Sequence, residues 1–110
     1  MTVIADERAA LACDSSAIPL PDRQAHFKLL HRLFVESAVE RKAVPGGYRF
    51  RFGADVVELV GRFVENERKC CPFLTFTIEV SGHSGPIWLE VTGPEGTREF
   101  LDAELPQIRG

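Results

Sequence analysis

The chain has 110 residues, of which 45% are hydrophobic, and this is typical of one globular domain whose core needs no metal or disulfide for support. Its 13 basic and 16 acidic side chains give a formal charge of -3, without the strongly basic character of nucleic-acid-binding proteins. No apolar run approaches the roughly 20 residues that cross a bilayer, and Asp6, Glu7 and Arg8 stand where a signal peptide is apolar. We therefore expect a cytoplasmic protein with reduced thiols that binds neither nucleic acid nor a membrane.

An N-terminal arm precedes the first predicted helix. Residues 1–21 show no periodic pattern and end in "IPLP", whose prolines favour extended backbone. From Asp22, a favourable N-cap, residues 22–40 carry an apolar stripe at helical spacing. The members of this stripe are Ala25, Leu29, Leu30, Leu33, Phe34 and Ser37. The chain is thus divided into an arm, residues 1–21, and a single domain, residues 22–110.

The middle of the domain is predicted to contain one strand and a second helix. Residues 48–52 alternate aromatic residues with arginine, which is typical of a strand with its aromatic side chains buried. A glycine follows, and Asp55 is expected to cap a helix whose apolar positions repeat at helical spacing. This helix should end at or just before Pro72.

A hairpin and a short helix complete the predicted domain. Residues 73–80 and 87–91 both alternate, and the "SGHSGP" turn separates them. The inward side chains are expected to be Leu74, Phe76, Ile78, Val80, Ile87, Leu89 and Val91. "TGPEG" then begins a last helix, which should direct Phe100, Leu101 and Leu105 inward.

The order helix, strand, helix, strand, strand, helix predicts the α+β class. We expect a small three-stranded sheet with helices packed on one face, as in a ferredoxin-like split unit that lacks its last strand. On the opposite face, cross-strand ion pairs account for Arg49 and Arg51 with Glu79 and Glu90. Trp88 lies among these charges and favours covering of the face by a second copy of the chain, in a homodimer, or by the arm.

The second helix carries the most distinctive group of side chains. Its buried stripe continues through Val60 and Phe63 to Glu67, and Cys70 and Cys71 follow Glu67 by three and four residues. Residues at these spacings share one helix face, so a carboxylate and two thiols are expected to meet on the last turn.

Two interpretations of this cluster are possible. Thiolates bind soft or borderline ions such as Zn(II), Cu(I), Hg(II) and As(III), and a carboxylate can complete a zinc shell. Against metal binding, vicinal cysteines strain the backbone when both face one ion, and a helix C-terminus disfavours a thiolate. Alternatively, the cysteines are small buried hydrophobes and Glu67 is a paired structural carboxylate.

The remaining thiol and the histidines are further candidates. Cys13 in the arm offers a third sulfur, which would make a trigonal site or, with Glu67 or a histidine, a four-ligand zinc site; otherwise it fills a groove. His26 and His31 are five residues apart, fall on different helix faces, and are interpreted as solvated or edge residues. His83 lies in the hairpin turn, where a polar ring needs no ligand to explain it.

The segments "ENERKCCPFLTFTIEV" and "GPIWLEVTGPEGTREFL" resemble a family of small bacterial proteins of unassigned function. The shared features are an ERxCCPF segment, a hairpin and a GPEG helix start, and they cover residues 45–102 most closely. The resemblance implies a common fold but no activity. It directs attention to Glu67, Arg68, Cys70, Cys71, Pro72 and Phe73.

The leading hypothesis from the sequence is a site that binds or senses a soft metal or metalloid. Its ligands are Cys70 and Cys71, with Cys13 and Glu67 as further members, and zinc or another thiophilic ion is the expected cofactor. Two alternatives stay open: a small homodimeric interaction module with structural cysteines, and a thiol redox protein. The sequence assigns no catalytic residue, and enzymatic activity is left open.

Overall fold

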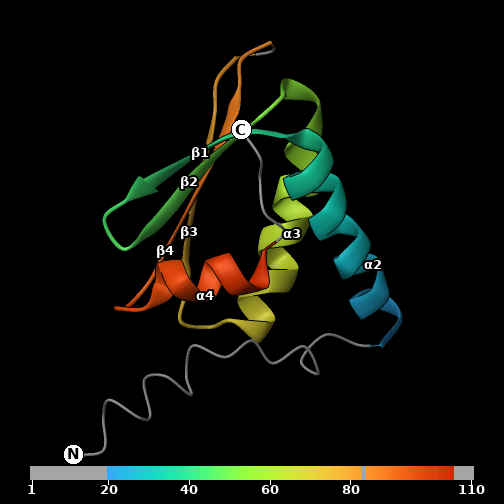
Figure 1. Cartoon of the computed structure of the whole chain (residues 1–110). Coiled ribbons are helices and arrows are strands. Elements are labelled where there is room, and N and C mark those ends of the chain that lie inside the picture. Colours follow the sequence, from blue (N-terminus) through green and yellow to red (C-terminus); the bar gives the residue numbers. More distant parts are fainter. Residues whose placement is uncertain (1–19, 83, 106–110) are drawn as a thin grey trace, which may run out of the picture.

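The computed structural model describes residues 20–82 and 84–105, which form helices packed against an antiparallel sheet (Figure 1). The class is therefore α+β, as expected. In chain order the elements are α2 (Leu20–His31), its π-helical continuation η2 (Arg32–Ser37), β1 (Ala38–Val44), β2 (Gly47–Phe52), the 3-10 turn η3 (Ala54–Val56), α3 (Val57–Cys70), β3 (Thr75–Val80), β4 (Ile87–Thr92) and α4 (Thr97–Glu104).

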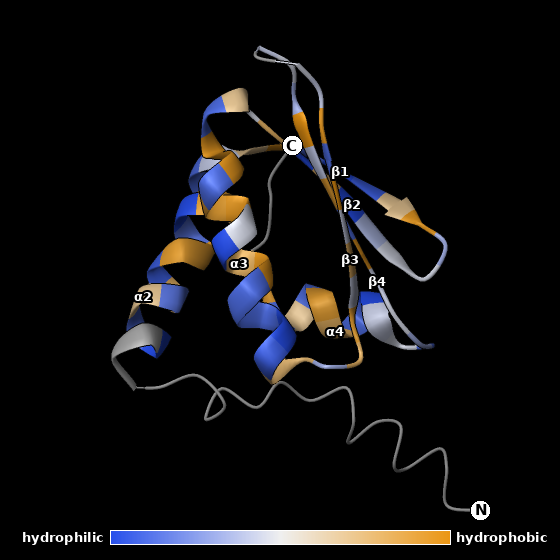
Figure 2. Ribbon diagram, turned by 180° about the vertical axis from the view of Figure 1, so that it is seen from behind, coloured by the Kyte–Doolittle hydropathy of each residue, from blue (hydrophilic) through white to orange (hydrophobic). Residues whose placement is uncertain are grey.

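The sheet has four strands in the order β1-β2-β4-β3, with every neighbouring pair antiparallel. Figure 1 and the reverse view in Figure 2 show α2, α3 and α4 on the same side of this sheet. The core lies between the two layers. Its fully buried side chains are Phe34, Phe50, Phe52, Phe63, Leu33, Ile87, Leu89, Val56, Val60, Val91 and Thr97.

The predicted count of three strands is wrong because residues 38–44 form the edge strand β1. The sequence pattern extended the first helix to residue 40, but the helix widens into a π turn and the backbone becomes extended at Ala38 (φ −72°, ψ 132°). A tight turn containing Gly46, with φ 81°, then returns the chain to β2. Pairing with β2 outweighs the helical tendency of this segment. The helix also begins at Leu20, upstream of the predicted N-cap Asp22.

The edge strand β3 also differs from the prediction. Ile78 and Val80 were expected in the core, but they are 40% and 54% exposed. They pair with Leu89 and Ile87, which are buried, so they lie on the helix-side face of the sheet. The side chains of β3 therefore alternate between the two faces as predicted. Ile78 and Val80 are nevertheless exposed, because the helices do not cover this edge of the sheet.

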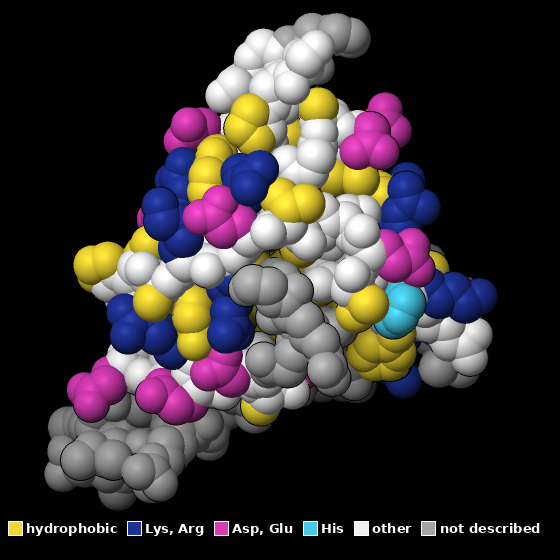
Figure 3. Space-filling model, turned by 45° about the horizontal axis from the view of Figure 1, so that its top comes forward, with side chains coloured by type: hydrophobic (Ala, Val, Ile, Leu, Met, Phe, Trp, Pro, Cys, Tyr) yellow, Lys and Arg dark blue, Asp and Glu magenta, His cyan; other side chains and the backbone are white. Residues whose placement is uncertain are grey.

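The outer face of the sheet is charged, and opposite charges are interleaved on it. Arg49 lies 3.1 Å from Glu79 and 3.8 Å from Glu90, which confirms the expected cross-strand pairs. The guanidinium of Arg49 also lies over the Trp88 ring, 4.5 Å from its centroid. Arg51 instead pairs with Glu40 of β1 at 2.9 Å. Figure 3 shows basic and acidic side chains interspersed on the molecular surface. Covering of Trp88 by a second copy or by the arm stays a prediction.

Charged and polar contacts join α4 to the β1–β2 hairpin. Asp102 accepts hydrogen bonds from Arg41 at 3.0 Å and from the Tyr48 hydroxyl at 3.1 Å. Arg98 donates to the carbonyl oxygens of Val44 at 2.6 Å and Gly47 at 3.2 Å. These contacts hold the short helix against the sheet. Phe100 is half-buried, whereas Leu101 and Leu105 are buried as predicted.

Gly61 offers a test of α3. It is exposed in the helix interior, and a Cβ at this position meets no atom within 4 Å. Because glycine destabilises a helix interior relative to alanine, Gly61→Ala should raise the free energy of unfolding by about 0.5–1 kcal/mol. Urea denaturation measures the change. Gly47→Ala is the opposite control, since its Cβ would collide with the Val91 carbonyl oxygen and destabilise the fold. A destabilised Gly61→Ala variant would contradict the assignment of an exposed helix interior.

Candidate metal centre

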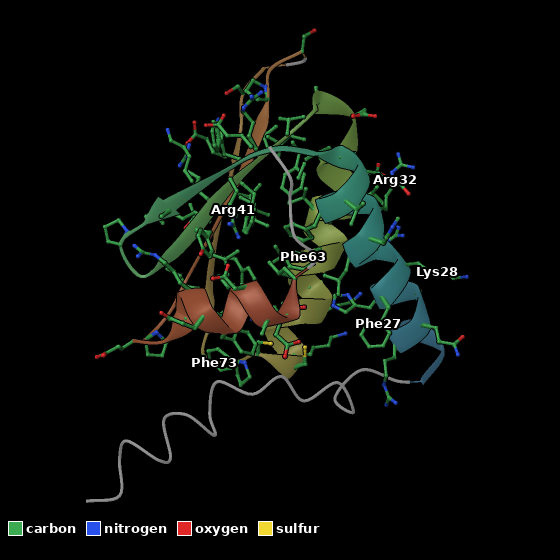
Figure 4. The ribbon with its side chains drawn as sticks, in the orientation of Figure 1. Phe27, Lys28, Arg32, Arg41, Phe63 and Phe73 are labelled. Carbon is green, nitrogen blue, oxygen red and sulfur yellow. The ribbon has the colours of Figure 1, made fainter. Side chains whose placement is uncertain are left out.

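The periodicity of α3 brings the predicted cluster together. Its buried positions are Val60, Phe63, Glu67 and Cys70, which recur at helical spacing along one face. Helical conformation ends at Cys70, so the carboxylate and the thiols lie at the C-terminal end of α3. Figure 4 shows the sulfur atoms there.

Glu67, Cys70 and Cys71 form a compact, buried donor cluster. One ligand atom from each residue lies within 4.8 Å of the others. The two sulfurs are 3.7 Å apart, and the Cys71 thiol donates to Glu67 Oε1 at 3.3 Å. The side chains are almost inaccessible: Glu67 is 4% exposed, Cys70 2% and Cys71 0%. The sulfur separation is far beyond the roughly 2.05 Å of a disulfide bond, so the two cysteines are not bonded to each other.

The end of the helix answers the objection that vicinal cysteines strain the backbone when their sulfurs face the same point. Cys70 is the last helical residue, whereas Cys71 has φ −129° and ψ 69° and has left the helix. The Cys71 N–H still donates to the Glu67 carbonyl at 2.8 Å, and its own carbonyl accepts from Leu74 N–H at 3.1 Å. These bonds fix the bend of the backbone. Cys70 and Cys71 both have negative φ, so their sulfurs converge without a residue in the left-handed conformation.

His26 is the functional residue that sequence reasoning missed. It was interpreted as solvated or peripheral, but it is 2% exposed and its Nε2 lies 2.9 Å from Glu67 Oε2. The ring also stacks on Phe63, with centroids 6.0 Å apart and an interplanar angle of 15°. His31 does match its interpretation, since its side chain is 61% exposed beside Glu36.

The missed signal was present in the helical spacing of α2. Leu29 and Leu33 continue a stripe that begins at His26, three residues before Leu29, and both are buried. Ala25, which was placed on the stripe, is exposed. A stripe defined by apolar residues alone excludes His26, although this residue lies on the buried face of α2. A buried imidazole needs a partner, and Glu67 of α3 supplies it.

The second ring nitrogen of His26 has unused hydrogen-bonding capacity. When Nε2–H donates to the Glu67 carboxylate, Nδ1 of the neutral ring is an acceptor. This atom is buried and has no hydrogen-bond partner among the described residues. His26 Nδ1 is therefore a buried hydrogen-bond acceptor that no other member of the cluster satisfies.

A second carboxylate influences the electrostatics of the site. The pKa of Glu104, on α4, is raised above its ordinary value of 4.5, first by desolvation of the carboxyl and second by repulsion from Glu67. Arg68, which the resemblance singles out, lies 4.0 Å from Glu65. Glu104 is thus a second carboxyl group that interacts electrostatically with Glu67.

The other predicted members have different positions. Cys13 and His83 lie outside the described residues. Phe73 packs edge-on against Phe100 of α4, with ring centroids 5.1 Å apart, and Figure 4 labels it beneath that helix. Pro72 is exposed in the turn after the cysteines. The CCPF segment thus provides two thiols, a turn and an aromatic contact that holds the turn against α4.

Comparison with known proteins supplies no assignment for the cluster. No protein-family model, curated protein or solved structure matches the chain. Among the described residues, no helix has the length and apolar character required to cross a membrane. The resemblance to small bacterial proteins with a CCPF segment stays a prediction. The function must therefore be inferred from the chemistry of the cluster.

Replacement of Glu67 tests the network in the metal-free protein. Glu67→Gln keeps an oxygen that can accept from His26 but loses the charge, so unfolding free energy should fall by about 1–2 kcal/mol. Glu67→Leu should cost more, because it leaves the buried His26 ring without its partner. Chemical denaturation in the presence of a chelator measures both. Glu65→Gln, at an exposed position of the same helix, is the control and should change little. A loss above about 3 kcal/mol for Glu67→Gln would indicate that the charge itself holds the network.

Glu104 gives a pH prediction. Because its pKa is raised in the folded state, the folded protein binds this proton more tightly than the unfolded chain does. The resulting stabilisation is complete below the ordinary value of 4.5 and is lost as pH rises through the folded pKa. Glu104→Gln should therefore become more stable relative to wild type as pH rises from acidic to neutral, in metal-free buffer. Thermal unfolding of both proteins across this range measures the difference in stability; a difference that does not change with pH would contradict the raised pKa of Glu104.

Proposed function

We propose that the protein binds a thiophilic metal ion, with zinc as the best match, through Cys70, Cys71 and Glu67. The observation that carries this proposal is the 3.7 Å separation of the two sulfurs. Two thiolates that are each about 2.3 Å from one tetrahedral ion are separated by about 3.8 Å. In the metal-free protein this contact is a hydrogen bond between the two thiols, and its length matches the spacing that a shared ion requires. The nearby carboxylate oxygen provides a third donor.

The composition of the donor set favours zinc over softer ions. Thiolates bind Zn(II), Cu(I), Hg(II) and As(III), but carboxylate oxygen is a poor ligand for the softest of these. Zinc accepts sulfur, nitrogen and oxygen ligands in a tetrahedral shell. Cys70 and Cys71 with Glu67 fit such a shell with one position left. We assign Cys13 as the candidate for that position, on the chemistry of its thiol.

His26 orients the carboxylate from outside the proposed shell. It holds Oε2 of Glu67, and the other oxygen, Oε1, is the one that faces the Cys71 thiol. Hydrogen bonds to a ligating carboxylate fix its orientation and typically change metal affinity when removed. His26 therefore acts as a positioning residue that directs one oxygen of Glu67 toward the proposed ion.

Metal binding would also relieve two unfavourable features of the cluster. The C-terminal end of α3 places partial negative charge near the thiols and so disfavours thiolates without a cation. Glu104 and Glu67 repel each other at the same place. A divalent cation offsets both effects, and its binding releases the thiol protons, so the affinity should increase with pH.

The alternative functions account for less of the geometry. A redox protein needs a thiolate that substrates can reach, whereas Cys70 and Cys71 are almost completely buried. An interaction module with packed cysteines explains their burial. It accounts for Glu67 through the pairing with His26, but it assigns no role to the convergence of both sulfurs and a carboxylate oxygen within 4.8 Å of one another.

Zinc titration of the reduced, chelator-treated protein tests the proposal. We expect saturable binding at one ion per chain, release of protons, and a melting temperature that rises with free zinc. Isothermal calorimetry in two buffers of different ionisation enthalpy measures stoichiometry and proton release together. The absence of saturable binding of zinc, mercuric ion and arsenite below about 1 mM would overturn the proposal.

Matched variants separate the roles of the side chains. Cys70→Ser combined with Cys71→Ser should abolish binding, and near-UV circular dichroism checks that the fold persists. His26→Gln should keep the stoichiometry but weaken affinity by about 10–100-fold, as expected for a residue behind a ligand. Cys13→Ser tests whether the Cys13 thiol occupies the fourth position of the zinc shell. Cobalt substitution should give thiolate-to-metal charge-transfer absorption in wild type and not in the double serine variant, and unchanged spectra in that variant would contradict ligation by these sulfurs.

A further inference from the structure

The two edges of the sheet are protected unequally. On the β1 edge, Glu40, Arg41 and Lys42 are consecutive charged residues, and the register shifts between Ala38 and Glu40. Charged side chains and irregular pairing are the means by which proteins prevent an edge strand from pairing with another chain. The β1 edge therefore has the features of an edge that stays unpaired.

The β3 edge lacks these protective features. β3 reads TFTIEV, without lysine, arginine or proline, and its pairing with β4 runs from end to end without a register shift. Its one charged residue, Glu79, is engaged by Arg49 at 3.1 Å. On the helix-side face, Ile78 and Val80 are 40% and 54% exposed. Regular backbone and exposed β-branched side chains make β3 a template for another strand.

We propose that β3 is the interface of a homodimer, in which two copies of β3 pair antiparallel and join the two sheets into one. This interface uses the sheet edge and differs from the face around Trp88 that the sequence suggested. The inference is independent of the proposed metal site, because it rests on the unequal edges of the sheet and on the sequence of β3.

The sequence of β3 is complementary to itself in one register. When Ile78 faces Ile78 of the partner subunit, Phe76 faces Val80 of the partner subunit, so all the apolar side chains meet on the helix side. On the outer side, Thr77 then faces Glu79 of the partner subunit. A register centred on Glu79 would place two carboxylates opposite each other, which is unfavourable.

This self-complementarity is the reason for choosing a second copy over a foreign strand. The pairing centred on Ile78 matches apolar with apolar residues and separates the like charges, with no requirement for a different sequence. Arg49 on the neighbouring strand β2 already neutralises Glu79 within each copy. The outer faces of the two sheets can therefore become continuous without an unpaired charge at their junction.

Lysine substitutions at two equally exposed positions test the proposal. Val80 on β3 and Val39 on β1 are both 54% exposed valines on edge strands. Wild type should sediment as a dimer at micromolar concentration and dissociate on dilution. Val80→Lys should weaken dimerisation by at least tenfold, whereas Val39→Lys should leave the dissociation constant unchanged. Analytical ultracentrifugation of all three proteins measures the constants, and near-UV circular dichroism confirms that each is folded.

Amide hydrogen exchange locates the interface directly. Alternate amides of β3 should become more protected as protein concentration rises, while amides of β1 should not. A wild-type protein that is monomeric at several hundred micromolar would overturn the proposal. So would a dimer that Val80→Lys leaves intact and that a substitution at Trp88 dissociates, because the interface would then be the outer face.

Discussion

The burial of the Glu67 carboxylate is the constraint on which the candidate site depends. A charge that is 4% exposed is costly unless polar partners replace its water, and here they come from two directions. His26 of α2 holds one oxygen at 2.9 Å, and the Cys71 thiol holds the other at 3.3 Å. One carboxylate thus joins α2, α3 and the turn after α3.

This connection places the donor cluster within the framework of the core. Phe63, one turn before Glu67, stacks on His26 and packs edge-on against Phe34, whose ring centroid is 5.1 Å away. Because the packed rings restrict the imidazole, they also restrict the carboxylate it binds. An ion bound by Glu67 and the cysteines would therefore stabilise the packing of α2 on α3, and loss of the ion would weaken it.

The two faces of the sheet carry different groups of side chains. Its helix side carries the core and the cluster, and its outer side carries Trp88 among paired charges. Trp88 has substantial cover from Arg49 within the same chain, so its presence alone gives less reason for a partner than the sequence suggested. The β3 edge, with its regular backbone and exposed Ile78 and Val80, is the stronger candidate for association.

The sequence by itself determined the features that depend on local geometry. The spacing of Glu67 and Cys70 predicted their shared face because helical periodicity places such residues together, and strand alternation predicted β2, β3 and β4 from an equally local pattern. The sulfur of Cys71 reaches the same place through the bend that follows the helix. Only the tertiary structure decided what depends on neighbours distant in the chain. Residues 38–44 became a strand through pairing with β2, and His26 became buried because Glu67 lies opposite it. Periodicity specifies which residues share a face, whereas burial and pairing depend on what packs against that face.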